Sequence, residues 1–246
     1  RYEGAKKSAR EDLKDKLNFK EGQQATASTI DAAIRVIQKY YREKGYWNVK
    51  VDVRQEVDPE SANAVIVTFV VNRGEKAKVQ EISFVGNHAF TDAKLRKKGL
   101  KETKRVLWWN PFRGAKYIEN KYQEDLASLI AFYNEKGYRD ARVLWDSVYT
   151  ISEKRVGIRI GLEEGAQYHI RDIRWVGNTV YNSEYLSEVL GMKKGDVYDQ
   201  TLIEKRLQID ENSVSTYYMD NGYLFFHVTP VETNVNNDSV SLEMRI

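Results

Sequence analysis

The side chains that could carry acid–base or metal chemistry are scattered along this sequence of 246 residues. Its three histidines are His88, His169 and His227, and none belongs to a His-Glu-x-x-His metal motif. The sequence also lacks a nucleophile elbow, a phosphate-binding loop and a dinucleotide fingerprint. With no cysteine, it has neither a disulfide framework nor a thiolate metal site. We therefore predict a protein that is not an enzyme, with no catalytic residue, no metal and no cofactor.

Composition indicates a folded domain rather than a nucleic-acid binder. Hydrophobic residues make up 41% of the chain and charged residues 30%, which is typical of folded soluble proteins. The net charge is only +3, too small a surplus to attract a polyanion along the whole chain. No apolar run approaches the roughly 18 residues that a membrane-spanning helix needs.

Two motifs recur along the chain at intervals of about 90 residues, which predicts a tandem repeat. Residues 82–87 read Ile-Ser-Phe-Val-Gly-Asn, and residues 173–178 read Ile-Arg-Trp-Val-Gly-Asn. A second motif places glycine and tyrosine after a helical stretch, at 45–46, 137–138 and 222–223. We predict three repeats over residues 1–76, 77–167 and 168–246. The first lacks the Val-Gly-Asn motif and is expected to lack its first strand, so that the chain would start inside a repeat.

Periodicity predicts the same order of elements in each repeat. An alternating strand ends at Val-Gly-Asn, two helices follow, and two alternating strands close the unit. In the first repeat Ile30, Ile34, Ile37 and Tyr41 share one helix face. Ser28 with Asp31 forms a predicted capping box. In the third repeat this helix is expected to be about one turn longer. The fold class is α+β: three tandem βααββ repeats in an extended array, each a three-stranded mixed sheet covered by two antiparallel helices.

Turns with the same backbone geometry in each repeat would explain the glycines and asparagines of these motifs. Glycine directly after a helix allows the positive φ that other residues adopt only with strain. Asparagine in a turn bonds its side chain to nearby backbone groups. We predict such structural roles for Gly45, Gly86, Asn87, Gly137, Gly177, Asn178 and Gly222.

The motifs resemble the POTRA domains of the Omp85 family. The βααββ order and the glycine after the second helix are shared by all three repeats, and the middle repeat is the most similar. Its residues 85–91 (Val-Gly-Asn-His-Ala-Phe-Thr) and 108–110 (Trp-Trp-Asn) resemble the third POTRA domain of outer-membrane protein assembly factors of this family. By order, the flanking repeats would be the second and fourth domains.

This resemblance implies a location and partners that composition does not reveal. It implies the periplasmic face of the outer membrane in Gram-negative bacteria, with the repeats attached in the full protein to a membrane β-barrel. The implied partners are unfolded outer-membrane protein clients and accessory lipoproteins of the assembly complex, with no nucleic acid.

An open sheet edge is the first candidate binding site. Unpaired N–H and C=O groups at an edge can accept an extended peptide by β-augmentation. The first strand of each closing hairpin is expected at the edge; the competing interpretation is an edge that only faces solvent. In the middle repeat the predicted edge residues are Ala141, Arg142, Val143, Leu144, Trp145, Asp146, Ser147, Val148 and Tyr149.

An insertion in the middle repeat is the second candidate site. Residues 101–113 lie between its two predicted helices and are rich in aromatic and basic side chains. Trp108, Trp109 and Phe112 could form a partner-binding patch. Alternatively, the two indoles fold back and cap their own helices, because an exposed tryptophan pair is costly in a monomer.

Two other classes of protein remain open. The repeats could belong to a different Omp85 or two-partner secretion transporter. A nucleic-acid-binding repeat is the other alternative, but Gly191 and Gly195 have the wrong spacing for a Gly-x-x-Gly loop.

Overall fold

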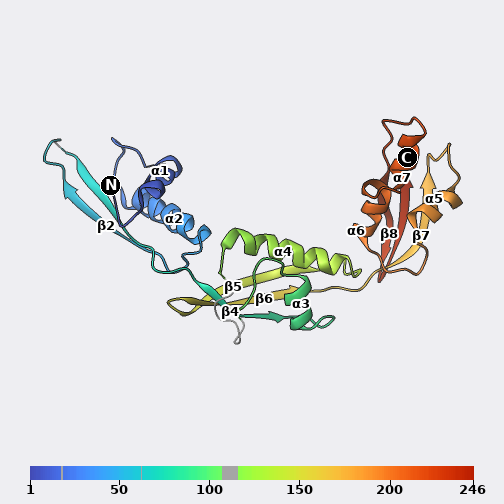
Figure 1. Ribbon diagram of the computed structural model, residues 1–246, viewed down its shortest axis with the longest axis horizontal. Coiled ribbons are helices and arrows are strands. Elements are labelled where there is room, and N and C mark those ends of the chain that lie inside the picture. Colours follow the sequence, from blue (N-terminus) through green and yellow to red (C-terminus); the bar gives the residue numbers. More distant parts are fainter. Residues whose placement is uncertain (18, 62, 107–115) are drawn as a thin grey trace. The chain divides into compact units, whose positions relative to one another are not determined.

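The computed structural model describes residues 1–17, 19–61, 63–106 and 116–246. These residues form three separate three-stranded sheets, each with its own helices beside it (Figure 1). In the first and third sheets the central strand pairs parallel to one neighbour and antiparallel to the other, so these sheets are mixed. The predicted fold class of α+β repeats with mixed three-stranded sheets is confirmed.

The first repeat contains β1 (Tyr2–Glu3), α1 (Lys7–Lys16), α2 (Ala27–Glu43), β2 (Lys50–Val57) and β3 (Val65–Asn72). Its sheet has the order β1-β3-β2. Apolar positions of α2 face the sheet as the helical period predicts, and Ile30, Ile37 and Tyr41 are buried with Phe69 of β3 in one core.

The middle repeat contains β4 (Lys78–Val85), α3 (Asp92–Lys98), α4 (Glu119–Asn134), β5 (Arg142–Ser152) and β6 (Arg155–Glu163), with the sheet order β4-β6-β5. Thr91 caps α3, since its side chain accepts from the Lys94 N–H. Along β6 apolar side chains alternate with glycine and charged residues, and the apolar face is buried. That face consists of Val156, Ile158, Ile160 and Leu162.

The third repeat contains β7 (His169–Val176), α5 (Ser183–Leu190), α6 (Gln200–Glu204), the π-helix η1 (Lys205–Ile209), α7 (Val214–Asp220), β8 (Thr229–Asn236) and β9 (Ser239–Arg245). Its sheet has the order β7-β9-β8. Asn182 caps α5, and Gly191 ends it in the left-handed region at φ 65°. Asp199 and Ser213 begin α6 and α7.

The first repeat does have its first strand, contrary to the sequence-based expectation. β1 is only two residues long and pairs in parallel with Phe69 and Val70 of β3. Gly4 follows it at φ +75°, where a Cβ would collide with the Val71 carbonyl oxygen. Gly86 and Gly177 make the same approach to the last strand of their own sheets. All three repeats therefore need a glycine after the first strand, whereas the full Val-Gly-Asn motif is absent from the first repeat.

Two helix predictions were also wrong in detail. Helix α2 begins after Thr26, whose side chain and that of Thr29 form a reciprocal capping box, so Ser28 lies inside the helix. The extra residues of the third repeat do not lengthen one helix by a turn. They are taken up by the wide π-helix η1 and by a break before Ser213, where a new cap starts α7.

The chain divides into two compact units. One consists of Arg1–Ser83, Lys101–Asp125 and Ser147–Arg159, and the other of Phe84–Leu100, Leu126–Asp146 and Ile160–Ile246. Within the described part of the chain, none of the helices has the length and apolar character required to cross a membrane.

Candidate peptide-binding edge

In each sheet the first strand of the closing hairpin is an edge strand: β2, β5 and β8 each pair with one neighbour in their sheet. Among the described residues, no loop makes a backbone hydrogen bond to β5 from outside its sheet. One side of β5 therefore presents N–H and C=O groups that no described residue outside the sheet pairs with, and such groups can pair with an incoming strand.

The three edge strands differ in how well they are guarded. Five of the eight residues of β2 are charged or amide-bearing, and β8 contains Pro230 and an irregularity between Glu232 and Asn234. Charge, proline and bulges are the features by which proteins block pairing at an edge. By contrast, β5 is 11 residues long, has no proline and carries only Arg142 and Asp146 as charges. Of the three strands β2, β5 and β8, it is the least guarded.

Aromatic side chains of β5 lie across glycines of the neighbouring strand. The Trp145 ring occupies the space where a Cβ of Gly161 would stand, and the Tyr149 ring does the same at Gly157. These glycines lie on the face of β6 opposite its buried core positions. Aromatic rings that cover cross-strand glycines strengthen a pair of strands. Trp145 and Tyr149 therefore hold β5 to its sheet while staying partly exposed.

Hydrogen bonds and ion pairs tie the same strand to the rest of the sheet. The Tyr149 hydroxyl donates to Glu81 of β4, and this bond raises the pKa of Tyr149. Arg142 donates from Nε to Glu163 of β6 over 2.7 Å. These contacts use side chains and leave the backbone groups at the outer edge of β5 available.

Exposed apolar side chains line this edge on both faces. Leu144 is 55% exposed, and Trp145 and Ile151 are 44% and 38% exposed. An extended peptide paired with β5 would place its own side chains beside these residues. Backbone pairing supplies little sequence preference, and the apolar neighbours favour peptides with alternating hydrophobic residues.

The structure describes some of the remaining predicted site residues and not others. Trp108, Trp109 and Phe112 lie outside the described residues. Asn87 and Asn178 each donate from Nδ2 to a carbonyl three residues on, at Phe90 and Tyr181, over 3.0 Å. The motif glycines have positive φ, as follows: Gly45 90°, Gly86 86°, Gly137 83°, Gly177 88° and Gly222 93°.

Sequence reasoning missed several features that bear on binding. The edge strand runs on to Ser152, three residues beyond the predicted range. The paired glycines Gly157 and Gly161 were a readable signal, because glycine at every fourth position of a strand leaves room for large cross-strand neighbours. Phe225 in the third repeat is fully exposed.

In the described part of the chain, no group of three or more His, Asp or Glu residues could hold a metal ion.

Comparison with known families agrees with this architecture. The family model of POTRA, described as a surface antigen variable number repeat, matches residues 1–74, 77–165 and 168–246. Because these matches cover nearly the whole sequence, the chain belongs to the POTRA family.

Its relatives are outer-membrane assembly factors. The chain is 28% identical over 217 residues to a candidate outer membrane protein assembly factor of Treponema pallidum, covering 86% of this chain and 24% of that protein. It is 26% identical over 203 residues to the outer membrane protein assembly factor BamA of Neisseria meningitidis, covering 80% and 25%. The chain thus spans about a quarter of the length of these relatives.

A solved structure shares the fold. The crystal structure of Haemophilus influenzae BamA POTRA3-5 superposes with a TM-score of 0.51 at 18% identity, covering 100% of this chain and 93% of that one. The matched domains are the third to fifth of that protein, whereas the sequence motifs indicated the second to fourth. The position of each repeat in its parent protein stays a prediction.

Proposed function

We propose that this chain is a periplasmic polypeptide-binding scaffold of an outer-membrane β-barrel assembly factor. On this proposal unfolded outer-membrane proteins bind by adding a strand to the β5 edge. Accessory lipoproteins dock on the repeats, and a membrane β-barrel is attached in the full protein. The family membership and the assembly-factor relatives support this role.

The observation that carries the proposal is the contrast among the three edges. β2 and β8 carry charge, a proline or a register irregularity, whereas β5 is long, apolar and free of proline. Selection against aggregation would normally remove such an edge. Its persistence is expected if another chain has to pair with it.

A pair of proline substitutions at successive positions tests this edge. In an antiparallel edge strand, alternate residues direct their N–H toward the neighbouring strand or away from it. One of Val143→Pro and Leu144→Pro therefore removes a hydrogen bond inside the sheet, and the other removes only an outward N–H. Circular dichroism and thermal unfolding identify the variant that keeps the fold.

The readout is crosslinking to a client strand. A photoreactive amino acid at Ile151 reports binding of a denatured outer-membrane β-barrel protein diluted from urea. We expect the well-folded proline variant to lose at least about tenfold in crosslinking, because the blocked edge cannot pair. Proline at Gln55 of β2 is the matched control and should leave crosslinking at Ile151 unchanged. Full crosslinking in the folded β5 variant would contradict the proposal.

A further inference from the structure

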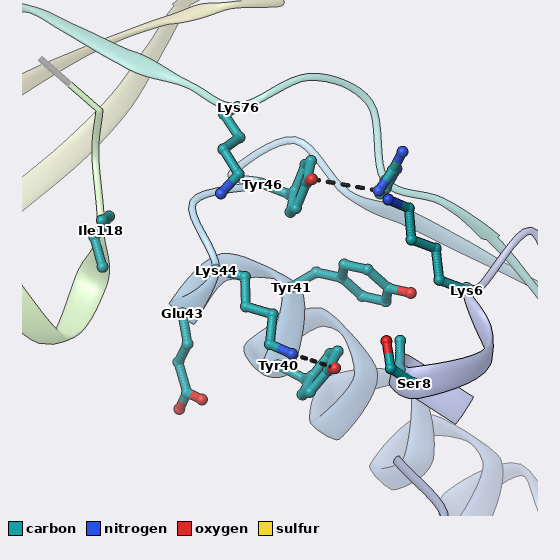
Figure 2. Close-up of a pocket in the computed structure, with 11 residues that line it drawn as sticks. Lys6, Ser8, Tyr40, Tyr41, Glu43, Lys44, Tyr46, Lys76 and Ile118 are labelled. Carbon is teal, nitrogen blue, oxygen red and sulfur yellow. Dashed lines mark hydrogen bonds between the residues drawn. The ribbon is translucent and has the colours of Figure 1, made fainter. Parts of the chain in front are cut away.

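A pocket of about 330 Å³ is lined mainly by residues of the first repeat, with Ile118 from the middle repeat at its border. Figure 2 shows α2 forming one wall, with the side chains of Tyr40, Tyr41 and Lys44 directed into it. Tyr46 and Lys76 close a second side, and Lys6 and Ser8 at the start of α1 a third. The lining residues are Lys6, Ser8, Ala9, Tyr40, Tyr41, Glu43, Lys44, Tyr46, Arg73, Lys76 and Ile118.

The charges around this pocket are unbalanced. Four cations line it, namely Lys6, Lys44, Arg73 and Lys76, against the single carboxylate of Glu43. Glu43 is itself 4.0 Å from Lys16, and Lys44 is the one lining cation with a carboxylate partner among the described residues, Asp12 at 3.1 Å. Lys6, Arg73 and Lys76 form no ion pair with any described residue.

The aromatic ring of Tyr46 packs against two of these cations. The Arg73 guanidinium lies 5.2 Å and the Lys76 amino group 5.3 Å from the centre of the Tyr46 ring. Arg73 also donates to the Tyr46 hydroxyl over 3.3 Å. A cation packed against a ring loses little further freedom when a ligand arrives. The positive charge of the pocket is therefore partly preorganised.

Tyr41 supplies a hydroxyl that faces the pocket. Tyr41 is 4% exposed as a whole residue, but its hydroxyl reaches solvent and makes no hydrogen bond with a described residue. By contrast, the Tyr40 hydroxyl donates to Asp12 and the Tyr46 hydroxyl accepts from Arg73. Figure 2 shows the Tyr41 hydroxyl directed between Lys6 and Ser8. Burial raises the pKa of Tyr41, so the group stays protonated and able to donate.

We propose that this pocket binds a phosphate group. A tetrahedral oxyanion offers several acceptor oxygens, and Lys6, Arg73 and Tyr41 offer separate donors to match them. Its charge offsets the excess of cations, and one of its oxygens accepts a hydrogen bond from the Tyr41 hydroxyl. A carboxylate has fewer oxygens and half the charge, so it fits the pocket less well.

Titration of the isotope-labelled chain with inorganic phosphate, at ionic strength held constant with chloride, tests the site by NMR. We expect saturable shifts of the Tyr41, Lys44 and Arg73 amides, and binding of acetate at least about tenfold weaker. Tyr41→Phe removes the hydroxyl and keeps the ring, and should weaken phosphate binding about tenfold. Lys39→Gln, an exposed cation on the same helix, is the matched control and should bind as the natural chain does.

Two further variants test the phosphate site independently, in case Tyr41→Phe does not fold. Arg73→Gln and Lys6→Gln should each weaken binding about tenfold or more, with unfolding temperatures checked for both. Absence of saturable phosphate binding would overturn the proposal. Equal losses in Lys39→Gln and Arg73→Gln would also overturn it, because they would indicate diffuse surface charge. Acetate binding as tight as phosphate would do the same.

The phosphate can belong to a soluble molecule or to a lipid headgroup, and vesicles distinguish the two sources. Co-sedimentation with phosphatidylcholine vesicles is compared with and without phosphatidic acid. Binding that requires phosphatidic acid and is lost in Arg73→Gln assigns the site to a headgroup. Saturable binding of inorganic phosphate with no co-sedimentation assigns it to a soluble phosphate compound. Either result supports the pocket as a phosphate site.

Discussion

A buried carboxylate stands at the end of the central strand of the middle repeat. Glu164 is 8% exposed and accepts from the N–H groups of His88 and Ala89 over 2.8 and 2.9 Å. It also accepts from the Tyr133 hydroxyl of α4 over 2.7 Å. Burial and this hydrogen bond raise the pKa of Tyr133. One side chain thus joins the turn after β4 to the helix that covers the sheet.

We predict that Glu164→Gln destabilises the middle repeat by about 1–3 kcal/mol. The amide has one acceptor oxygen in place of two, and its NH2 group would face another donor, so a buried N–H loses its partner. Urea unfolding followed by hydrogen exchange of residues 84–100 measures the effect. Tyr133→Phe is the milder control, because the carboxylate keeps both backbone partners. An unchanged unfolding midpoint in Glu164→Gln would refute this role.

At the scale of the element, β5 and β6 show how glycine and aromatic residues depend on each other across strands. Gly157 and Gly161 would be weak points in an isolated strand, since glycine orders at greater entropic cost and packs nothing. Here their missing side chains make room for Tyr149 and Trp145. The edge strand is thereby attached through its side chains, and its outer backbone groups stay available.

We predict that Gly161→Ala displaces the Trp145 ring. The new methyl group would occupy the position of the indole, so the ring has to swing into solvent. Fluorine NMR of a 5-fluorotryptophan-labelled chain detects the movement, with the Trp145 signal assigned from Trp145→Phe. Gly195→Ala is a useful comparison, because no atom lies within 4 Å of a Cβ there, although its φ of +91° strains it. A Trp145 signal unmoved by Gly161→Ala would count against the packing described.

Local patterns in the sequence predicted much of this element structure. The apolar stripe of α2 and the alternation of β6 depend only on neighbours in the chain, and both were read correctly. The start of α2 was misplaced because Thr26, Ser28 and Thr29 are all good capping residues. β1 was missed because two residues show no periodicity. The covering of glycines by aromatic rings depends on strand order and register, which periodicity does not reveal.

At the scale of the whole molecule, the first and third repeats have separate hydrophobic cores. The core of the first repeat draws every residue from positions 9–71, and that of the third from positions 168–244. Each core is sealed by its own sheet and helices. Repeats of this kind gain most of their stability internally, so each is expected to open as its own cooperative unit.

We predict that core mutations act on one repeat at a time. Ile37→Ala in α2 should cost about 2–5 kcal/mol, because both the transfer of the side chain and the remaining cavity oppose folding. Hydrogen exchange should then accelerate for β3 amides and stay unchanged for β9 amides. Leu207→Ala, in η1 of the third repeat, should give the reverse pattern. Equal acceleration of both strands by either variant would show that the chain unfolds as a single unit.

The sequence by itself determined the number of repeats, their order of elements and the residues that face each core. These properties follow from hydrophobic period and from short motifs, which act over one or two turns or strands. The edge position of the closing hairpin's first strand also followed from reasoning about three-stranded sheets.

Only the tertiary structure showed which strands lie at sheet edges and where charged groups meet. β2, β5 and β8 occupy the same place in their sheets, and their difference became meaningful once that place was known. Lys6, Tyr41 and Arg73 lie far apart in the sequence, yet they line one pocket because α1, α2 and the end of β3 pack together. The meeting of these residues depends on how distant segments pack together. Hydrophobic periodicity in a single sequence does not reveal that packing.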